Sequence, residues 1–335
     1  MKAYQLQKFD LQDLVVVEQN EPHLESRQVL VKFHAVSLNY RDLMFAKGVY
    51  NPHAKLPSVP FSDGAGEVAA VGEGVTRWKP GDCVCPIFMQ GWLEGEPSWE
   101  KQRTALGGGD RDGVLREYGA FDESSLVRIP DHLSFEEAAT LPCAAVTAWN
   151  ALVDIGRLKA GDTVLTLGTG GVSIFALQFA KIHGARVIVT SSSDEKLARA
   201  RMLGADETIN YKKIPDWEKE VLRLTDRVGV DHVVELGGAG TVAKSVSAVR
   251  VGGCVTLIGV LMPGAGFNPV SLLMKAVRMH GVFVGSRRMF EDMNHAIAAN
   301  ALKPVIGKTF LFAQVREALE YMESGSHFGK IIVKL

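Results

Sequence analysis

Short apolar runs rich in β-branched residues fill the first third of the chain. They span residues 14–19, 28–38, 64–72 and 81–88, and turn residues such as Pro80 bound them. This pattern predicts a β-rich unit with many short connections. Residues 90–119 interrupt it, because they are rich in glycine and charge and have little periodicity. A segment of this length indicates either a solvated surface lobe or a functional loop that forms part of a substrate wall.

The periodicity becomes helical at Ser134, which forms a capping-box pattern with Glu137. After this helical stretch, strand-like and helix-like runs alternate. The expected strands are 163–168, 185–191, 207–211, 230–237, 253–260 and 279–286, and the expected helices are 173–184, 194–204, 217–225 and 241–252. Alternation of this kind predicts βαβ units and a parallel sheet with helices on both faces. The tail returns to mixed character, with helices near 291–300 and 314–324 and a final strand at 330–335.

Composition narrows the class of protein. The 335 residues are 47% hydrophobic and 22% charged, which is enough to build a large core in one large or two ordinary domains. The net charge of -1 gives no general attraction to nucleic acid or to an anionic membrane. The four cysteines form no Cys-x-x-Cys pair, and no apolar run approaches the ~20 residues of a membrane span. We therefore expect a soluble, cytoplasmic protein without disulfides.

A glycine-rich turn joins the strand at 163–168 to the helix that follows it. Its residues are Gly168, Gly170, Gly171 and Val172, with Ser173 at the start of the helix. Glycines at this spacing allow a tight turn and a close approach of a pyrophosphate to the backbone, and the helix N-terminus holds the phosphates. The turn predicts dinucleotide binding. An ordinary glycine-rich connection is the alternative.

The end of the next strand indicates which dinucleotide binds. An acidic residue there would bond the ribose 2′-hydroxyl of NAD, but the strand ends in Ser191, Ser192 and Ser193. Lys196 follows in the first helical turn, and Tyr211 ends the next strand. Hydroxyls and a lysine accept a 2′-phosphate, which a carboxylate would repel, so the pattern predicts NADP(H). A serine that caps a helix, with a solvated lysine beside it, is the alternative.

Segments at 64–75, 79–84, 136–152, 167–181, 203–211, 229–238, 252–260 and 329–335 share their order and spacing with one protein family. On these segments the chain resembles the medium-chain dehydrogenase/reductase superfamily, in particular its zinc-independent quinone oxidoreductase-like and alcohol dehydrogenase-like members. The resemblance implies a GroES-like β-rich catalytic domain, 1–126 plus 300–335, interrupted by a Rossmann NADP(H)-binding domain, 127–299. It also implies a homo-oligomer, a dimer or tetramer joined through the edge of the Rossmann sheet near 253–260.

The zinc ligands of the related alcohol dehydrogenases are mostly replaced here. Asn39 stands where the first cysteine would be, and Ser62 stands where the histidine would be. Only Cys143 remains, and one thiolate cannot hold a zinc ion that needs three protein ligands. Residues 90–119, which match the structural zinc lobe, contain no cysteine, and Cys83 and Cys85 point to opposite faces of a strand. We therefore expect no metal, and we expect Cys143 to be a small buried side chain beside the cofactor.

This loss of zinc bears on the reaction. Zinc would polarise a carbonyl or stabilise an alkoxide, and without it the developing charge must be met by hydrogen bonds or spread through the substrate. Quinones and α,β-unsaturated carbonyls spread this charge themselves. The sequence therefore favours NADPH-dependent reduction of a small quinone or conjugated carbonyl. A zinc-free alcohol or aldehyde dehydrogenase is one alternative, and an NADPH-binding sensor or structural protein with little turnover is another.

The resemblance also suggests site residues. Asn39 and Tyr40 are expected to face the nicotinamide. Asp42 and Asp63 match acids behind the zinc ligands, unless they pair with Arg41 or a backbone amide. Tyr50 is expected to donate a proton or hydrogen bond to the substrate, unless it is a surface-loop aromatic. The expected cofactor contacts outside the glycine turn and the serine run are Thr147, Gly259, Val260, Ser286, Arg287, Gly329 and Lys330.

Overall fold

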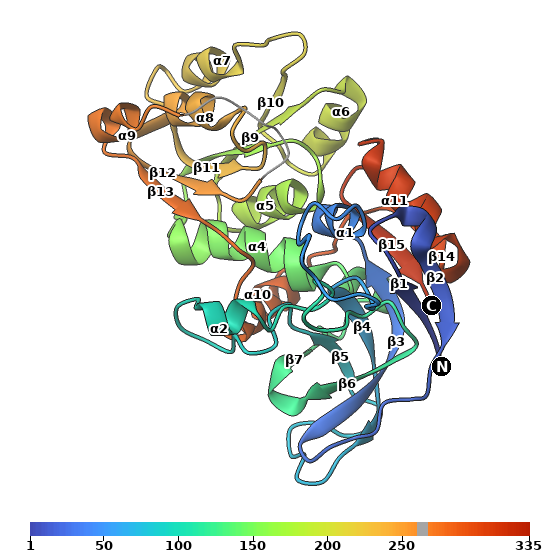
Figure 1. Cartoon of the computed structure of the whole chain (residues 1–335). Helices are drawn as coiled ribbons and strands as arrows, with labels where there is room; N and C mark the ends of the chain where they lie inside the picture. Colours follow the sequence, from blue (N-terminus) through green and yellow to red (C-terminus); the bar gives the residue numbers. More distant parts are fainter. Residues whose placement is uncertain (260–266) are drawn as a thin grey trace. The chain divides into compact units, whose positions relative to one another are not determined.

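The computed structural model describes residues 1–259 and 267–335 (Figure 1). The chain forms two compact units: unit 1 is Met1–Val146 with Gly285–Leu335, and unit 2 is Thr147–Val284. The predicted architecture, a parallel-sheet domain inserted in a β-rich domain, is confirmed. Among the described residues, no helix combines the length and the apolar character needed to cross a bilayer.

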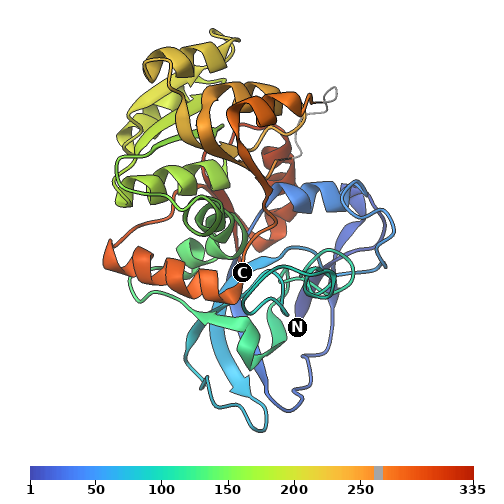
Figure 2. The same cartoon turned by 90° about the vertical axis from the view of Figure 1, so that its left-hand side faces the viewer.

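The boundaries of the units differ from the expected divisions at 126/127 and 299/300. They fall at 146/147 and 284/285. The second difference arises because helix α10 (Arg287–Ala299) lies beside strand β7 (Leu126–Arg128) within unit 1, as Figure 2 shows. Nδ2 of Asn294 donates a 2.9 Å hydrogen bond to the carbonyl oxygen of Arg128.

Unit 2 is built on a six-stranded sheet in which every pairing is parallel. In sheet order the strands are β10 (Glu207–Asn210), β9 (Arg186–Ser191), β8 (Thr163–Leu167), β11 (Val230–Glu235), β12 (Val249–Leu257) and β13 (Arg278–Gly281). The chain order reverses between β8 and β11. In open α/β sheets, ligands bind at the carboxyl ends of the strands at such a reversal. This reversal of the strand order lies beside the glycine-rich turn.

Helices cover both faces of this sheet, as the alternating pattern predicts (Figure 1). They are α4 (Val146–Trp149), the π-helix η4 (Asn150–Ile155), α5 (Gly171–Ile182), α6 (Asp194–Met202), α7 (Trp217–Leu224), α8 (Val242–Ala248) and α9 (Val270–Lys275). Trp217, Val221 and Val246 pack against strand residues in one apolar cluster. The expected helix at 241–252 is wrong in its second half. It ends at Ala248, and the β-branched run from Val249 belongs to β12.

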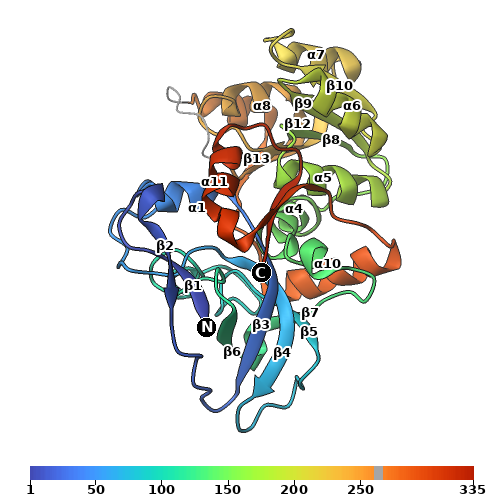
Figure 3. The same ribbon diagram turned by 90° about the vertical axis from the view of Figure 1, so that its right-hand side faces the viewer.

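Unit 1 contains a seven-stranded sheet and a two-stranded sheet. The larger sheet has the order β14 (Ile306–Leu311), β15 (Lys330–Lys334), β3 (Gln28–Ser37), β4 (Asp63–Val71), β5 (Cys83–Pro86) and β7, with β6 (Tyr118–Asp122) also paired to β3. The smaller sheet joins β1 (Lys2–Leu6) and β2 (Leu14–Glu18). Strand β15 pairs antiparallel with β3, with Ile332 opposite Ser37. The C-terminus of the chain accordingly lies beside β3 (Figure 3). This pairing brings the C-terminal strand to the end of β3, next to Asn39.

The helices of unit 1 are short apart from α10. They are α1 (Tyr40–Ala46), α2 (Trp99–Gln102), α3 (Phe135–Ala138), the π-helix η3 (Leu141–Ala145) and α11 (Val315–Glu323), with 3₁₀ turns at Leu11–Asp13, Glu123–Ser125 and Phe312–Gln314. The predicted capping box is confirmed. The backbone N–H of Glu137 donates to Ser134 Oγ over 3.2 Å, and the N–H of Ser134 donates to the Glu137 carboxylate over 2.9 Å.

Candidate functional site

A buried cluster of charged and polar side chains lies where three elements of unit 1 begin. Asn39 is the N-cap of α1 and Asp42 lies in its first turn, Asp63 starts β4, and Lys330 starts β15. We call these four residues the lysine–carboxylate cluster. All four are at least nine-tenths buried. Charged groups are rarely buried unless they are paired, so this concentration marks a site with a specific role.

The Lys330 ammonium holds the cluster together. Nζ donates to the carbonyl oxygen of Leu38 over 2.7 Å and to Oδ1 of Asn39 over 2.6 Å. It also lies 3.7 Å from a carboxylate oxygen of Asp63. The ammonium that the sequence assigned to a cofactor contact is therefore bonded within unit 1.

The two carboxyl groups of the cluster are bonded mainly to backbone amides. Asp42 accepts a 2.7 Å hydrogen bond from the N–H of Asn39. Asp63 accepts bonds from the Ser62 hydroxyl over 2.8 Å and from the N–H of Cys143 over 3.2 Å. Burial raises the pKa of Asp42 to about 6, although the neighbouring charge of Arg41 acts in the opposite direction. Burial also raises the pKa of Asp63, and Lys330 counters this rise.

The family positions of the catalytic zinc ligands do not fit a metal ion in this chain. Oδ1 of Asn39 accepts from an ammonium, and the hydroxyl of Ser62 donates to Asp63. The third position is Cys143, which is half-buried and not fully buried as expected, and it is one sulfur ligand where zinc needs three protein ligands. Within residues 1–259 and 267–335, no group of three His, Cys, Asp or Glu side chains has a geometry for a metal. These side chains lack the donor set of a tetrahedral zinc site.

Two tyrosines were expected near the reacting groups. Tyr40 is the first residue of α1, and its side chain is exposed. Tyr50 is half-buried, and the guanidinium carbon of Arg41 lies 5.0 Å from the centre of its ring. Burial raises the pKa of the Tyr50 phenol, so it stays protonated at neutral pH. Tyr50 is thus packed against a buried cation.

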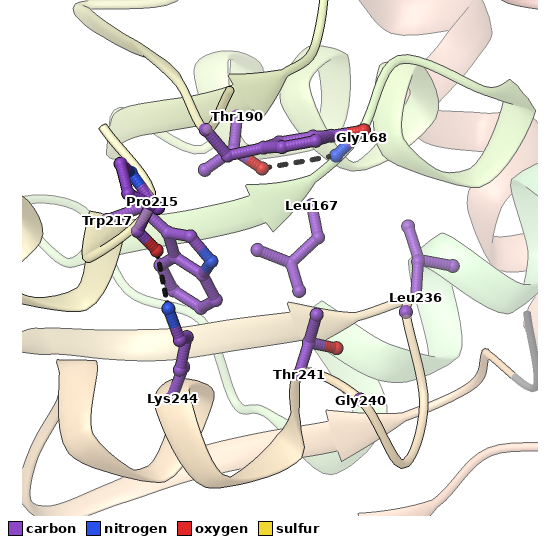
Figure 4. A pocket seen from close by; sticks show the side chains of 11 residues that line it. Leu167, Gly168, Thr190, Pro215, Trp217, Leu236, Gly240, Thr241 and Lys244 are labelled. Carbon is purple, nitrogen blue, oxygen red and sulfur yellow. Dashed lines mark hydrogen bonds between the residues drawn. The ribbon is translucent and has the colours of Figure 1, made fainter. Parts of the chain in front are cut away.

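Unit 2 contains a pocket of about 430 Å³ at the carboxyl ends of β8, β9, β10 and β11 (Figure 4). The lining residues are Leu167, Gly168, Thr190, Tyr211, Pro215, Trp217, Leu236, Gly237, Gly240, Thr241 and Lys244. Gly168 has φ +80°, a backbone conformation that favours glycine. Two residues of the predicted cofactor site, Gly168 and Tyr211, therefore line one pocket.

The N-terminus of α5 suits a pyrophosphate. Gly170 is its N-cap, and Gly171 and Val172 form its first turn, so their backbone N–H groups carry no side-chain cap. The hydroxyl of Ser173 donates to the carbonyl oxygen of Leu167 over 2.7 Å. Ser173 therefore closes the turn internally, and the turn has the free donors and the small residues that a phosphate group needs.

Of the three serines at the end of β9, one has a clear structural role as a helix cap. Ser191 is buried, and Ser193 caps α6 by accepting from the N–H of Lys196 over 3.4 Å. Ser192 and the Lys196 side chain are half-buried, and burial lowers the pKa of Lys196. Asp194, the acid nearest to this strand end, is bonded to Asn210 and Lys213 over 2.7 and 2.5 Å.

The remaining residues predicted to contact the cofactor lie in several different elements of the two units. Thr147 is buried at the start of unit 2, and a Cβ on Gly259 would lie 1.7 Å from the carbonyl oxygen of Leu236. Ser286 caps α10, and Arg287 donates to the carbonyl oxygen of Ser124 over 2.9 Å. Gly329 has φ +70°, and a Cβ there would meet the carbonyl oxygen of Val305. Val260 lies outside the described residues.

The sequence reasoning missed part of the unit 2 pocket and the packing of one residue of unit 1. Lys244, on α8, donates to the carbonyl oxygen of Pro215 across the pocket (Figure 4). Buried Glu235, at the end of β11, accepts from the N–H groups of Gly237 and Gly238 over 2.7 and 3.0 Å and so shapes the pocket rim. Glu235 could have been recognised from the sequence, because it is an acidic residue at the end of an apolar strand. The missed residue of unit 1 is Arg41.

Comparison with known proteins assigns the chain to a family. The family model for an alcohol dehydrogenase GroES-like domain matches residues 25–131, and that for a zinc-binding dehydrogenase matches residues 171–299. A zinc-type alcohol dehydrogenase-like protein of Schizosaccharomyces pombe is 47% identical over 319 residues, which cover 93% of this chain and 92% of that protein. The chain is a medium-chain dehydrogenase/reductase. It is therefore an oxidoreductase of a family that binds nicotinamide cofactors.

Two further members of this superfamily are informative. The crystal structure of a putative alcohol dehydrogenase from Sinorhizobium meliloti 1021 has a TM-score of 0.93 and 41% identity, and the match covers 100% of this chain and 98% of that one. A chloroplastic NADPH-dependent alkenal/one oxidoreductase of Arabidopsis thaliana is 31% identical over 341 residues, which cover 99% of this chain and 79% of that protein. Relatives of this medium-chain dehydrogenase/reductase thus carry the names of both alcohol dehydrogenases and enone reductases.

Proposed function

We propose that the protein transfers hydride from NADPH to a quinone or an α,β-unsaturated carbonyl without a metal ion. The observation that carries this proposal is the Lys330 ammonium bonded to Oδ1 of Asn39, at the position of the family's first zinc ligand. A side chain that already accepts from an ammonium is a poor ligand for a second cation. The similarity to an NADPH-dependent alkenal/one oxidoreductase supports the same reaction class.

The chemistry of the substrate explains how the reaction proceeds without zinc. NADPH supplies a hydride, which adds to a carbon conjugated with the carbonyl group. The displaced electron pair moves to the carbonyl oxygen, so the charge is spread over the substrate and does not have to be borne by a metal. A proton then completes the reduction. Simple ketones cannot spread the charge in this way, so conjugated substrates are favoured.

Two side chains are proposed to meet the developing charge. The buried Nδ2 of Asn39 lies on the side of the Asp63 carboxylate, whose pKa the Asn39 side chain helps to lower, and no hydrogen bond of standard geometry joins Nδ2 to a described residue. A substrate oxygen beside this amide would accept a hydrogen bond from Nδ2. Tyr50 is the proposed proton donor, because its phenol is protonated at neutral pH and the adjacent Arg41 guanidinium favours loss of the proton. Tyr40 is proposed to lie beside the nicotinamide, as expected from the sequence.

The cofactor preference is proposed to be NADP(H). The strand end at Ser191–Ser193 carries no acid, and Asp194 is already bonded to Asn210 and Lys213. Ser192 and Lys196 are the proposed contacts of the 2′-phosphate, and Tyr211 is proposed to pack against the adenosine. The glycine turn, Thr147, Gly259, Val260, Ser286, Arg287 and Gly329 are proposed as further cofactor contacts. Lys330 is proposed to act by fixing Asn39 and Asp63.

A zinc-free alcohol or aldehyde dehydrogenase is the second candidate, favoured by the names of the Schizosaccharomyces pombe and Sinorhizobium meliloti proteins. A binding protein with little turnover is the third. One experiment separates the three. Oxidation of NADPH and NADH is followed at 340 nm with a panel of quinones, enones, aldehydes and saturated ketones, and the reverse reaction is followed with alcohols. We expect turnover with conjugated substrates and a preference for NADPH.

Turnover of alcohols and saturated carbonyls alone would support the second candidate, and tight NADPH binding without turnover would support the third. Tyr50→Phe tests the proton donor. We expect kcat to fall by about 10- to 100-fold with the fold intact. Tyr118→Phe, a half-buried tyrosine in β6, is the matched control.

A homo-oligomer formed at the sheet edge is part of the proposal. In the described part of the chain, β13 pairs with β12 on one side only, so β13, one strand beyond the segment expected from the sequence, is the edge. Helix α9 beside it exposes Leu273 and Met274. An unpaired strand edge next to exposed apolar side chains is a favourable surface for a symmetric contact.

A further inference from the structure

We propose that Arg41 binds a carboxylate on the substrate and so selects conjugated carbonyl compounds that carry an acid group. This inference rests on the proposed function, because it names the class of substrate that the same site accepts. Arg41 is the second residue of α1, two positions after Asn39. It therefore belongs to the segment that carries the proposed substrate contacts.

The Arg41 side chain is held in one plane by two aromatic rings. The guanidinium carbon lies 5.0 Å from the centre of the Tyr50 ring and 4.6 Å from the centre of the Phe88 ring. Nη1 donates a 2.9 Å hydrogen bond to the carbonyl oxygen of Leu106. Arg41 is only 9% exposed. Cation–π contacts and a buried hydrogen bond fix the guanidinium before any ligand arrives, which lowers the entropic cost of binding.

The remaining edge of the guanidinium is unused. Nε and Nη2 are buried and have no hydrogen-bond partner in the described residues. These two nitrogens form one side of the planar fork, and their N–H bonds run parallel, in the geometry that a carboxylate matches with its two oxygens. Each unpaired buried donor costs about 1–3 kcal/mol. A bidentate acid ligand would satisfy both donors at once.

No carboxylate of the described chain occupies this edge. The adjacent Asp42 accepts from the N–H of Asn39, and Asp112, near the same loop, accepts from the N–H of Val59 over 2.8 Å. Gly108 lies beside Nη2, and a Cβ at this position would be 3.0 Å from it. The absence of a side chain at Gly108 keeps that nitrogen clear. Leu106 and Gly108 belong to the 90–119 segment, so this segment forms part of the border of the proposed acid site.

A matched pair of substrates tests the proposal. The probes are 4-oxo-2-pentenoate and its methyl ester, which share the enone and differ in charge. Because the ester is also the more electrophilic alkene, the deciding quantity is the change in the acid-to-ester ratio between the wild type and a variant. We expect the wild-type protein to reduce the acid with the higher kcat/KM. In Arg41→Met, the ratio of kcat/KM for acid over ester falls by on the order of 100-fold, the value of a charge-assisted bidentate pair. Arg41→Lys restores part of the ratio, and Arg103→Met, at an exposed arginine of the same segment, leaves it unchanged.

The outcomes distinguish this inference from the proposed function. If neither probe nor any conjugated substrate is reduced, the proposed function fails. If Arg41→Met keeps the wild-type ratio of kcat/KM for acid over ester, only the role of Arg41 is overturned. A loss of kcat with neutral enones equal to the loss with the acid would also overturn it, because Arg41 would then act on the enolate oxygen.

If Arg41→Met does not fold, inhibition of the wild-type protein gives the answer. The saturated acid 4-oxopentanoate should compete with the substrate, and its methyl ester should not. Equal inhibition by both compounds, or by neither, would contradict the proposal.

Discussion

Nζ of Lys330 donates a 2.6 Å hydrogen bond to Oδ1 of Asn39, although 291 positions separate the two residues in the chain. The contact exists because β15 pairs antiparallel with β3, and the chain turns into α1 directly after β3. Asp63 at the start of β4 completes the arrangement, 3.7 Å from the same ammonium. A C-terminal cation therefore sets the orientation of an N-terminal amide that the proposed reaction uses.

Lys330→Met should destabilise the protein strongly. The variant keeps most of the side-chain volume but leaves the Asp63 carboxylate buried without its cation, which typically costs about 3–5 kcal/mol. Urea-induced unfolding measures this loss. Lys334→Met on the same strand is the control, because the Lys334 side chain is 57% exposed and its pair with Glu136 contributes under about 1 kcal/mol. Equal losses for the two variants would show that the lysine–carboxylate cluster is not a buried ion pair.

Asp42→Asn should raise stability at neutral pH. The pKa of Asp42 in the folded protein is about 6, above the value for an unfolded chain, so the wild-type protein loses stability as the pH rises from about 4 to above 6. Asparagine mimics the protonated acid and avoids this loss. The variant should be more stable by about 3 kcal/mol at pH 7.5, and this advantage should disappear near pH 4.

Unfolding curves at several pH values provide the measurement for Asp42. Asp110→Asn, at an exposed position, should show no pH-dependent difference from the wild type. An Asp42→Asn variant that is less stable than the wild type at every pH would mean that the buried carboxylate is needed in its charged form.

Ser192→Asp should reverse the cofactor preference. A carboxylate at the end of β9 would repel the 2′-phosphate of NADPH and could bond the ribose hydroxyl of NADH. We expect the KM for NADPH to rise by about 10- to 100-fold, with a smaller change for NADH. Ser26→Asp, at an exposed serine, is the charge-matched control. Unchanged kinetics with both cofactors would place the 2′-phosphate elsewhere.

A symmetric contact at β13 makes a prediction about mass in solution. Leu273 and Met274 are 78% and 75% exposed on α9, so a double change to glutamate should dissociate an oligomer formed there. Light scattering coupled to size-exclusion chromatography measures the mass. Met202→Glu, at a similarly exposed methionine on α6, should leave the mass unchanged. A wild-type monomer, or an oligomer that survives the double change, would contradict the assignment.

The sequence predicted unit 2 well because its strands and helices have uniform hydrophobic periods. Helix α1 was not predicted, since its buried face includes the charged residues Arg41 and Asp42, which hide the apolar pattern. Strand β14 was also missed, because Gly307 and two polar residues follow its first position. Local pattern therefore identified regular elements and failed where a buried charge or an edge strand altered the period.

The residues of the candidate site also fall into two groups, those that a local motif predicts and those that depend on long-range contacts. The turn at Gly168–Gly171 and the helix that follows it could be predicted because a short motif carries its own geometry. The partners of Lys330 could not be found, because they depend on strand pairing between distant parts of the chain. Arg41 was considered only as a partner for Asp42 or Asp63, since neither its burial nor its two ring contacts can be recognised in the sequence.

The central claim is hydride transfer from NADPH without a metal ion, and metal content measured together with activity tests it most directly. The protein is purified without chelators, its zinc is determined by mass spectrometry, and its rate of NADPH oxidation with a conjugated enone is measured before and after treatment with a strong chelator. The account predicts far less than one zinc per chain and an unchanged rate. Close to one zinc per chain, with activity that is lost on chelation and restored by zinc, would contradict it.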